Sequence, residues 1–232
     1  MKKIQQLNQG WTMKTAEGTA YPTSIPSSMY QVLYENGAIE DPYWRTNEEK
    51  YLSLSEKDYS YFTEFDVEVE IFDKPSIILD FEGIDTLADI RLNGIMLGRS
   101  DNMHRQWRFD VKSYLVPRGN RLEVDLRSPV RFIRDEYPKC VCDGAPECMK
   151  GFPHLRKAHY MFGWDWGPRL PDLGIFRSVN LCGYDESRIK DVHILQHHSD
   201  GRVVLEVRVD TETPHDTVLF RPFMFFRSFL FS

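Results

Sequence analysis

The chain has 232 residues, which is enough for one sandwich-sized domain and part of another. Its 29 Lys and Arg residues and 35 Asp and Glu residues give a net charge of −6 with no long basic run, which argues against a nucleic-acid partner. No apolar run approaches the roughly 18 residues that a membrane helix needs, and the start MKKIQQLNQGW has no apolar segment behind its lysines, so we expect no membrane partner, no secretory signal and a cytoplasmic protein.

The N-terminal part predicts one short helix and then an irregular aromatic segment. Ser27 or Ser28 is placed to cap a helix over Met29–Asn36, and Gly37 would end that helix. The next segment, DPYWRTNEEKY, is rich in aromatic residues. By themselves these residues indicate only that the segment packs against another part of the protein.

From Tyr59 onward the apolar residues recur with a period of two, which is typical of half-buried β-strands. We predict a first strand that continues from Tyr61 to Ile71. Asn93-Gly94, between two apolar segments, predicts a two-residue hairpin turn. The other predicted elements are strands at 76–83, 107–111, 122–126 and 175–181, and a short helix at 130–137. Many short strands separated by turns indicate an all-β sandwich.

Three of the four cysteines, Cys140, Cys142 and Cys148, fall within one loop, KCVCDGAPECMK. Their C-x-C-x5-C spacing, with His154 six residues further on, could supply metal ligands, but it lacks the paired C-x2-C units of a strong zinc signal. We therefore expect reduced loop thiols that all react with thiol reagents, and neither a metal nor a cofactor.

Residues 155–177, LRKAHYMFGWDWGPRLPDLGIFR, have the composition of a binding loop. Two glycines and a proline within six residues exclude a helix, so we predict a strand over Arg156–Phe162 that ends in a tight loop. This loop would hold Trp164 and Trp166 on either side of Asp165. Indole faces pack on the C–H faces of sugars and a carboxylate accepts hydrogen bonds from hydroxyls, which indicates a carbohydrate contact. The alternative is that the indoles fill a core or a domain interface.

Two motifs resemble glycoside hydrolase family 2, and its β-mannosidases in particular. The run FGWDWGPRLPDLGIFR resembles the β-mannosidase signature, and it departs from the usual pattern at Asp172, Leu173 and Phe176, beyond the loop. The pattern FEGIDTxAxIxLNGxxLG is similar to the sugar-binding domain shared across the family. The resemblance implies that Trp164 and Asp165 help to form the subsite for the terminal mannose of a β-mannoside.

The resemblance also implies an architecture. Residues 1–183 would form a jelly-roll-like, galactose-binding-domain-like β-sandwich with a short N-terminal helix, crossed by the arm that contains DPYWRTNEEKY. Residues 184–232 would be the truncated start of an immunoglobulin-like β-sandwich, with strands at Asp191–Gln196 and Val203–Val209. The final run FRPFMFFRSFLFS is apolar without alternation, and we expect it to be exposed and prone to aggregation.

The function implied is that of the N-terminal portion of a retaining β-mannosidase, with a β-mannoside oligosaccharide as its partner. In the family the two catalytic glutamates lie on a (β/α)₈ barrel, which takes about 250 residues. Too few residues follow residue 183 for such a barrel, so we expect no catalytic residue here and no activity from this chain alone. Two alternatives stay open: a free-standing carbohydrate-binding module, and a structural sandwich without hydrolase activity.

Overall fold

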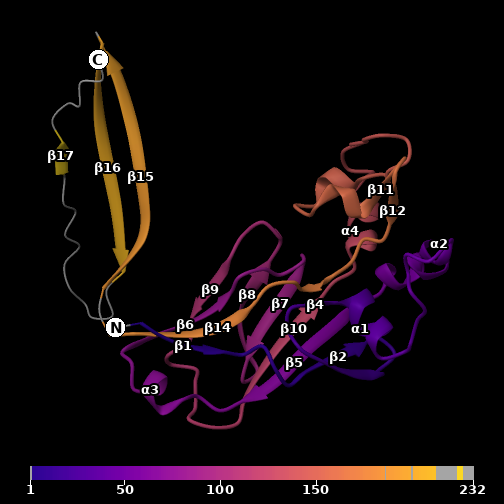
Figure 1. Cartoon of the computed structure of the whole chain (residues 1–232), viewed down its shortest axis with the longest axis horizontal. Coiled ribbons are helices and arrows are strands. Elements are labelled where there is room, and N and C mark those ends of the chain that lie inside the picture. Colours follow the sequence, from indigo (N-terminus) through magenta and orange to yellow (C-terminus); the bar gives the residue numbers. More distant parts are fainter. Residues whose placement is uncertain (1, 186, 200, 213–223, 227–232) are drawn as a thin grey trace.

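The computed structural model describes residues 2–185, 187–199, 201–212 and 224–226, and two β-sheets that face each other dominate it (Figure 1). The smaller sheet has the strand order β1 (Lys3–Gln6), β14 (Val179–Tyr184), β6 (Ser76–Phe81) and β9 (Trp107–Asp110). The larger sheet has the order β3 (Ala20–Thr23), β2 (Trp11–Thr15), β5 (Tyr59–Phe65), β10 (Asn120–Leu126), β7 (Ala88–Leu92) and β8 (Ile95–Ser100). Neighbouring strands in both sheets are antiparallel. The predicted all-β sandwich is confirmed.

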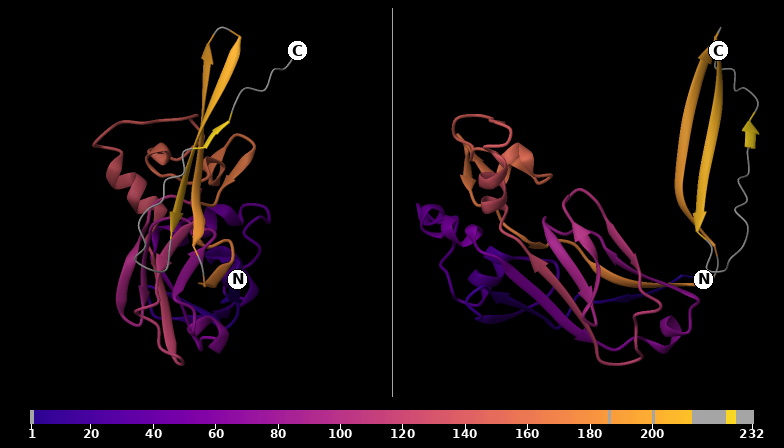
Figure 2. Two further views of the ribbon diagram at one scale, coloured as in Figure 1. Left: turned by 90° about the vertical axis from the view of Figure 1, so that its left-hand side faces the viewer. Right: turned by 180° about the vertical axis from the view of Figure 1, so that it is seen from behind.

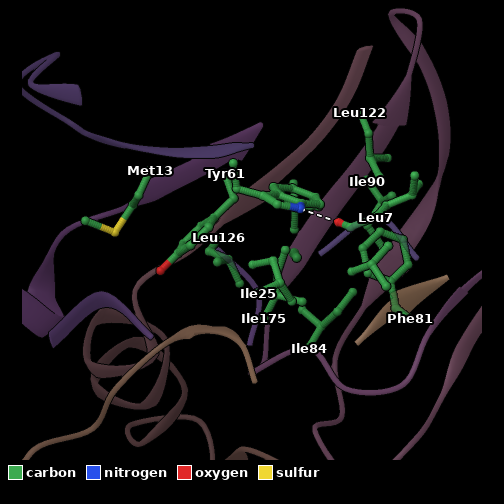
Figure 3. Packing of buried hydrophobic residues seen from close by; sticks show 14 of the residues in the cluster. Leu7, Met13, Ile25, Tyr61, Phe81, Ile84, Ile90, Leu122, Leu126 and Ile175 are labelled. Atoms are coloured by element: carbon green, nitrogen blue, oxygen red, sulfur yellow. Dashed lines mark hydrogen bonds between the residues drawn. The ribbon is translucent and has the colours of Figure 1, made fainter. Parts of the chain in front are cut away.

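The main core lies between the two sheets and is built mainly from inward-facing residues of the strands, with further residues from α1 (Met29–Glu35) (Figure 3). In β10 the residues Leu122, Val124 and Leu126 are buried and the residues between them are half-buried, which is the alternation that the sequence shows. The indole of Trp11 is buried in the same core, and its Nε1 donates a hydrogen bond to the carbonyl oxygen of Leu7. This partner matters because a buried polar group without one costs free energy.

Two local predictions are confirmed. Helix α1 (Met29–Glu35) begins directly after Ser28, whose Oγ accepts a hydrogen bond from the backbone N–H of Gln31 at 3.5 Å. The β7–β8 hairpin turns at Asn93 and Gly94, whose φ angles of 52° and 79° are the left-handed values that such a two-residue turn requires.

The strand predicted over Tyr61–Ile71 is wrong in its second half. β5 ends at Phe65, and a one-turn helix, α3 (Val69–Phe72), follows it. Ile71 is fully buried while Val69 is 74% exposed. A strand would have placed both side chains on the same face, so the alternating apolar letters here reflect a turn of helix with one buried side.

Between β10 and β13 (Gly174–Ile175) the chain leaves the sheets and forms a second, smaller core. Helix α4 (Pro129–Glu136) agrees closely with the predicted helix at 130–137. The members of this second core are Leu87, Ile133, Cys148, Phe152, Leu155 and Phe162. The remaining short elements are β4 (Ser27–Ser28), α2 (Asn47–Tyr51) and the 3-10 turns η1 (Leu52–Glu56), η2 (Phe152–His154) and η3 (His159–Met161). None of the helices in the described part of the chain is long and apolar enough to cross a membrane.

A long hairpin follows the sandwich and projects away from it (Figure 2). It consists of β15 (Arg188–Ser199) and β16 (Arg202–Glu212), and the short β17 (Met224–Phe226) pairs with β16. Both strands predicted here are confirmed and are longer than expected. The immunoglobulin-like character of this part and the boundary at residue 183 stay predictions. Apart from Met224–Phe226, the apolar C-terminal run lies outside the described residues.

We predict that the core between the two sheets sets the stability of the protein. Ile90 on β7 is fully buried, whereas Ile95 on β8 is 44% exposed. Ile90→Ala should lower the free energy of unfolding by about 2–5 kcal/mol, because it removes buried methyl groups and leaves a cavity. Ile95→Ala should change it by less than about 1 kcal/mol. Urea unfolding followed by tryptophan fluorescence measures both, and equal losses would contradict this location of the core.

Candidate functional site

The tryptophan-rich segment forms a short hairpin at the end of the sandwich that lies away from β15 and β16 (Figure 1). Its strands are β11 (Phe162–Trp164) and β12 (Gly167–Arg169), and Trp164 pairs with Gly167. Asp165 and Trp166 form the two-residue turn between them. The glycines and the proline thus make the tight loop that the sequence predicts, with the indoles and the carboxylate at its tip.

The strand predicted over Arg156–Phe162 is wrong. Residues His159–Met161 form the turn η3, and regular pairing begins only with β11. The backbone before η3 makes isolated bonds instead, one from the N–H of Lys157 to the carbonyl oxygen of Leu155 and two that involve Met103. The N–H of Met103 donates to the carbonyl oxygen of Arg156 at 3.0 Å, and the sulfur of Met103 accepts from the N–H of Ala158 at 2.9 Å. Partners of this kind hold the chain in place but do not extend into a strand ladder.

The side chains at the tip of the hairpin are exposed. Trp164 is 43% exposed and Trp166 is 75% exposed, and Asp165 is exposed between them. The two indole centroids lie 6.4 Å apart with an angle of 46° between the ring planes, so the rings are not stacked face to face. Neither indole belongs to the two cores of the described chain. Of the two interpretations of these residues, burial in a core of this domain is excluded.

The cysteine loop is hydrogen-bonded to both strands of the hairpin. Gly163 has a φ of 98°, and a Cβ at this position would lie 2.5 Å from Cγ of Arg169, so the close approach of the two strands requires glycine. The thiol of Cys148 donates to the carbonyl oxygen of Gly163 at 2.8 Å, and Nε of Arg169 donates to the carbonyl oxygen of Glu147 at 2.8 Å. Each strand of the hairpin is therefore anchored to the same short segment.

The prediction of three reactive loop thiols stays a prediction, but the burial of Cys148 argues against it at that position. Its side chain is buried in the second core, whereas Cys140 is exposed and Cys142 is half-buried. The sequence of the cysteine loop does not show that the loop folds back against the tryptophan hairpin. In the described ranges no group of three or more His, Cys, Asp or Glu residues is arranged to hold a metal ion.

The hairpin borders an open hollow of about 380 Å³. Part of its lining is the tip of the hairpin, and the rest comes from Pro42, Tyr43, Arg45 and Glu48, which lie just before and within α2. The aromatic sequence of this second segment predicts packing, but Tyr43 is 75% exposed and does not belong to either core. The residues of this segment that line the hollow are therefore the part of the site that sequence reasoning missed.

The lining has the chemistry of a sugar-binding surface. It combines aromatic faces with the carboxylates of Asp165 and Glu48 and the guanidinium of Arg45. Carboxylates only accept hydrogen bonds and a guanidinium only donates them, whereas a hydroxyl can do both. A polyhydroxylated ligand with apolar C–H faces therefore matches this set of groups better than an apolar ligand does.

The base of the hairpin segment is held by a buried cation. Lys157 is 1% exposed, and its ammonium forms an ion pair with Asp85 and donates to the carbonyl oxygen of Asp172 at 2.7 Å. Oδ1 of Asp172 accepts from the backbone N–H groups of Tyr30 at 3.2 Å and Leu173 at 2.8 Å. The sequence positions that depart from the β-mannosidase pattern thus include a residue that joins the base of the hairpin to α1.

Burial raises the pKa of Asp172 from its ordinary value of 3.8 to about 6. Hydrogen bonds from Ser28 and from the N–H groups of Leu173 and Tyr30 act in the opposite direction, as does the charge of Lys157, but they do not offset the loss of hydration. The carboxyl group at the base of the site therefore changes its charge in mildly acidic solution.

Comparisons with known proteins found one matching family and several relatives of this chain. Residues 11–177, which include both motifs, match the family described as "Glycosyl hydrolase 2 galactose-binding domain-like". The chain is 32% identical over 193 residues to the β-mannosidase of Mus musculus. The aligned region covers 77% of this chain and 21% of the mouse protein. It is 32% identical over 235 residues to β-mannosidase B of Neosartorya fischeri, covering 91% of this chain and 26% of the relative.

A solved structure supports the same relationship. The crystal structure of the β-D-mannosidase from Dictyoglomus thermophilum superposes with a TM-score of 0.77 at 34% sequence identity, over 91% of this chain and 26% of that chain. The chain therefore spans between 21% and 26% of the length of these three relatives.

We predict that the three loop cysteines differ in reactivity. In the native protein Cys140 and Cys142 should be labelled rapidly by a thiol reagent, while Cys148 should be labelled only after unfolding, because it is buried and its thiol is hydrogen-bonded. Mass spectrometry of peptides after timed labelling, with a urea-unfolded sample as the control, measures each site. Equal rates at all three cysteines in the native state would contradict the supporting role of Cys148.

We also predict a pH-dependent contribution from Asp172. Between about pH 4 and pH 6 the folded protein retains a proton that the unfolded chain releases, so the contribution of this carboxyl to stability is full below about pH 4 and is lost as pH rises through about 6. Relative to Asp172→Asn, which can still accept from both N–H groups, the unmodified protein should lose about 2–3 kcal/mol of stability over this range. Urea titrations of both proteins at several pH values measure the difference, and a difference independent of pH would refute it.

Proposed function

Because the chain belongs to the glycosyl hydrolase 2 galactose-binding domain-like family, we propose that it is the N-terminal part of a longer enzyme that hydrolyses terminal, non-reducing β-D-mannose residues. The three relatives described above are β-mannosidases, and this chain spans about a quarter or less of each of them. The β-sandwich would supply part of the sugar site, and the rest of the enzyme would supply the reacting groups.

The observation that carries the proposal is the exposed hairpin tip beside the hollow. Trp164 and Asp165 lie at the rim of a hollow of about 380 Å³ and do not belong to either core of the described chain. Small-ligand sites generally bury most of the ligand in a space of about 300–1,000 Å³. The hollow has a volume in this range, and its lining of indoles and a carboxylate could form one wall of such a site.

In the proposed mechanism Asp165 accepts hydrogen bonds from hydroxyls of the terminal mannose, and the indole of Trp164 packs on its C–H face. Retaining hydrolysis needs two further carboxyl groups about 5–5.5 Å apart, one as nucleophile and one as acid and base. We assign both to the part of the enzyme that lies beyond these 232 residues. The 232-residue polypeptide alone is accordingly proposed to bind β-mannosides weakly and to leave them uncleaved.

In the complete enzyme, Asp165→Ala should lower kcat/KM for an aryl β-mannoside by roughly ten- to a hundred-fold, which corresponds to the loss of about 1.5–3 kcal/mol from charge-assisted hydrogen bonds. The melting temperature should hardly change, because Asp165 lies at an exposed turn outside both cores. Steady-state kinetics and thermal unfolding of the same preparations measure the two effects.

Asp101→Ala is a matched control, since Asp101 is exposed like Asp165 but does not line the hollow. It should leave kcat/KM unchanged. A lower melting temperature with unchanged kcat/KM for Asp165→Ala would show that the hairpin serves packing between domains. Tight, saturable binding of methyl β-mannoside to the 232-residue polypeptide would instead favour a carbohydrate-binding module.

A further inference from the structure

The segment that faces the hollow beside the tryptophan hairpin, residues 41–48, is a loop with several internal hydrogen bonds, which we call the arm loop. Oδ1 of Asp41 accepts from the N–H of Tyr43 at 2.8 Å, and its carbonyl oxygen accepts from Nδ2 of Asn47 at 2.8 Å and from the N–H of Trp44 at 3.1 Å. Helix α2, which begins within the arm loop, contacts β12 of the hairpin. These hydrogen bonds and the contact with β12 hold the arm loop beside the hairpin.

Arg45 occupies an unfavourable position in this loop. Its φ of 54° is left-handed, a conformation that residues other than glycine, asparagine and aspartate rarely adopt. Within the part of the chain that the structure describes, its side chain has one recorded partner, the ring of Trp44, whose centroid lies 5.4 Å from the guanidinium carbon. An arginine held in a strained backbone conformation without a carboxylate partner is unexplained by the fold, and such strain is concentrated at functional sites.

The chemistry of Arg45 complements that of the hairpin. Arg45 and Asp165 both line the hollow, and they present groups of opposite hydrogen-bonding character. A guanidinium offers only N–H donors and an ionised carboxylate offers only acceptors. A sugar hydroxyl can accept from the first while it donates to the second, and hydrogen bonds linked in this way strengthen each other.

We propose that Arg45 is a substrate-binding residue of the same site, and that the arm loop is its second wall. Its guanidinium donates to hydroxyl oxygens of the sugar whose hydroxyl hydrogens Asp165 accepts. This inference rests on the proposed function, because it deepens the description of the β-mannoside site. It adds the arm loop to a site that the sequence located in the hairpin alone.

The test uses Arg45→Asn in the complete enzyme with 4-nitrophenyl β-D-mannoside as the probe. Asparagine tolerates the left-handed conformation and removes the guanidinium, so the melting temperature should stay the same or rise. The loss of charge-assisted hydrogen bonds should lower kcat/KM by about ten- to a hundred-fold. Arg45→Lys, which keeps the charge but not the planar fork, should give a smaller loss.

Arg105→Asn is the matched control. Its guanidinium carbon lies 5.1 Å from the ring centroid of Trp107, and it is exposed like Arg45 but is not part of the hollow. It should keep kcat/KM within about two-fold. A variant Arg45→Asn that also keeps kcat/KM within about two-fold would overturn the inference, whatever its melting temperature.

The two proposals fail in different ways. If Asp165→Ala lowers kcat/KM and Arg45→Asn does not, only the role of the arm loop is refuted. If neither substitution affects the hydrolysis of the mannoside, the sugar-binding roles of Asp165 and Arg45 are both refuted while the proposed hydrolase activity stands. If the complete enzyme does not cleave the mannoside, the proposed function and the inference are refuted together.

Discussion

The ammonium group of Lys157 is buried beneath the site, where it pairs with Asp85 and donates to the carbonyl oxygen of Asp172 at 2.7 Å. Lys157 and Asp172 are the two ends of the segment that carries the tryptophan hairpin, so one cation joins both ends to the loop around Asp85. Removing one partner from a buried ion pair typically costs about 3–5 kcal/mol, because it leaves an uncompensated charge in the interior. The position of the hairpin on the sandwich therefore depends on the ion pair of Lys157 and Asp85, neither of which lines the hollow.

The two walls of the hollow are held by separate sets of bonds. The hairpin is anchored to the cysteine loop through Cys148 and through the backbone of Glu147. The arm loop is held by its own hydrogen bonds around Asp41. Loops that are already ordered lose less conformational freedom when a ligand binds, so more of the interaction energy appears as affinity. In the proposed site, the two walls would therefore position the sugar, and the groups that cleave it would come from the rest of the enzyme.

Some parts of the fold could be predicted because their signals lie within a few residues. Asn93-Gly94 specifies its turn through backbone conformations that few other pairs adopt, and Ser28 caps a helix through the N–H of Gln31, three residues along the chain. The strand patterns fail where a buried side chain belongs to another element. Ile71 is the buried residue of a one-turn helix, and Lys157 is buried where it pairs with Asp85. An alternating sequence pattern predicts neither environment.

The sequence by itself determined the sandwich from Tyr59 onward and the tight loop that carries Trp164 and Asp165, because periodicity, turn residues and helix breakers act locally. It did not predict β1, β2 and β3, and it left the exposure of the loop open. The assignment of Trp164 and Asp165 to a mannose subsite came from the family resemblance and stays a proposal. Only the tertiary structure decided that Cys148 lies under the hairpin and that Arg45 lines the same hollow as Asp165. These features depend on contacts between distant segments, as in the buried ion pair whose partners are 72 residues apart, and no local propensity encodes them.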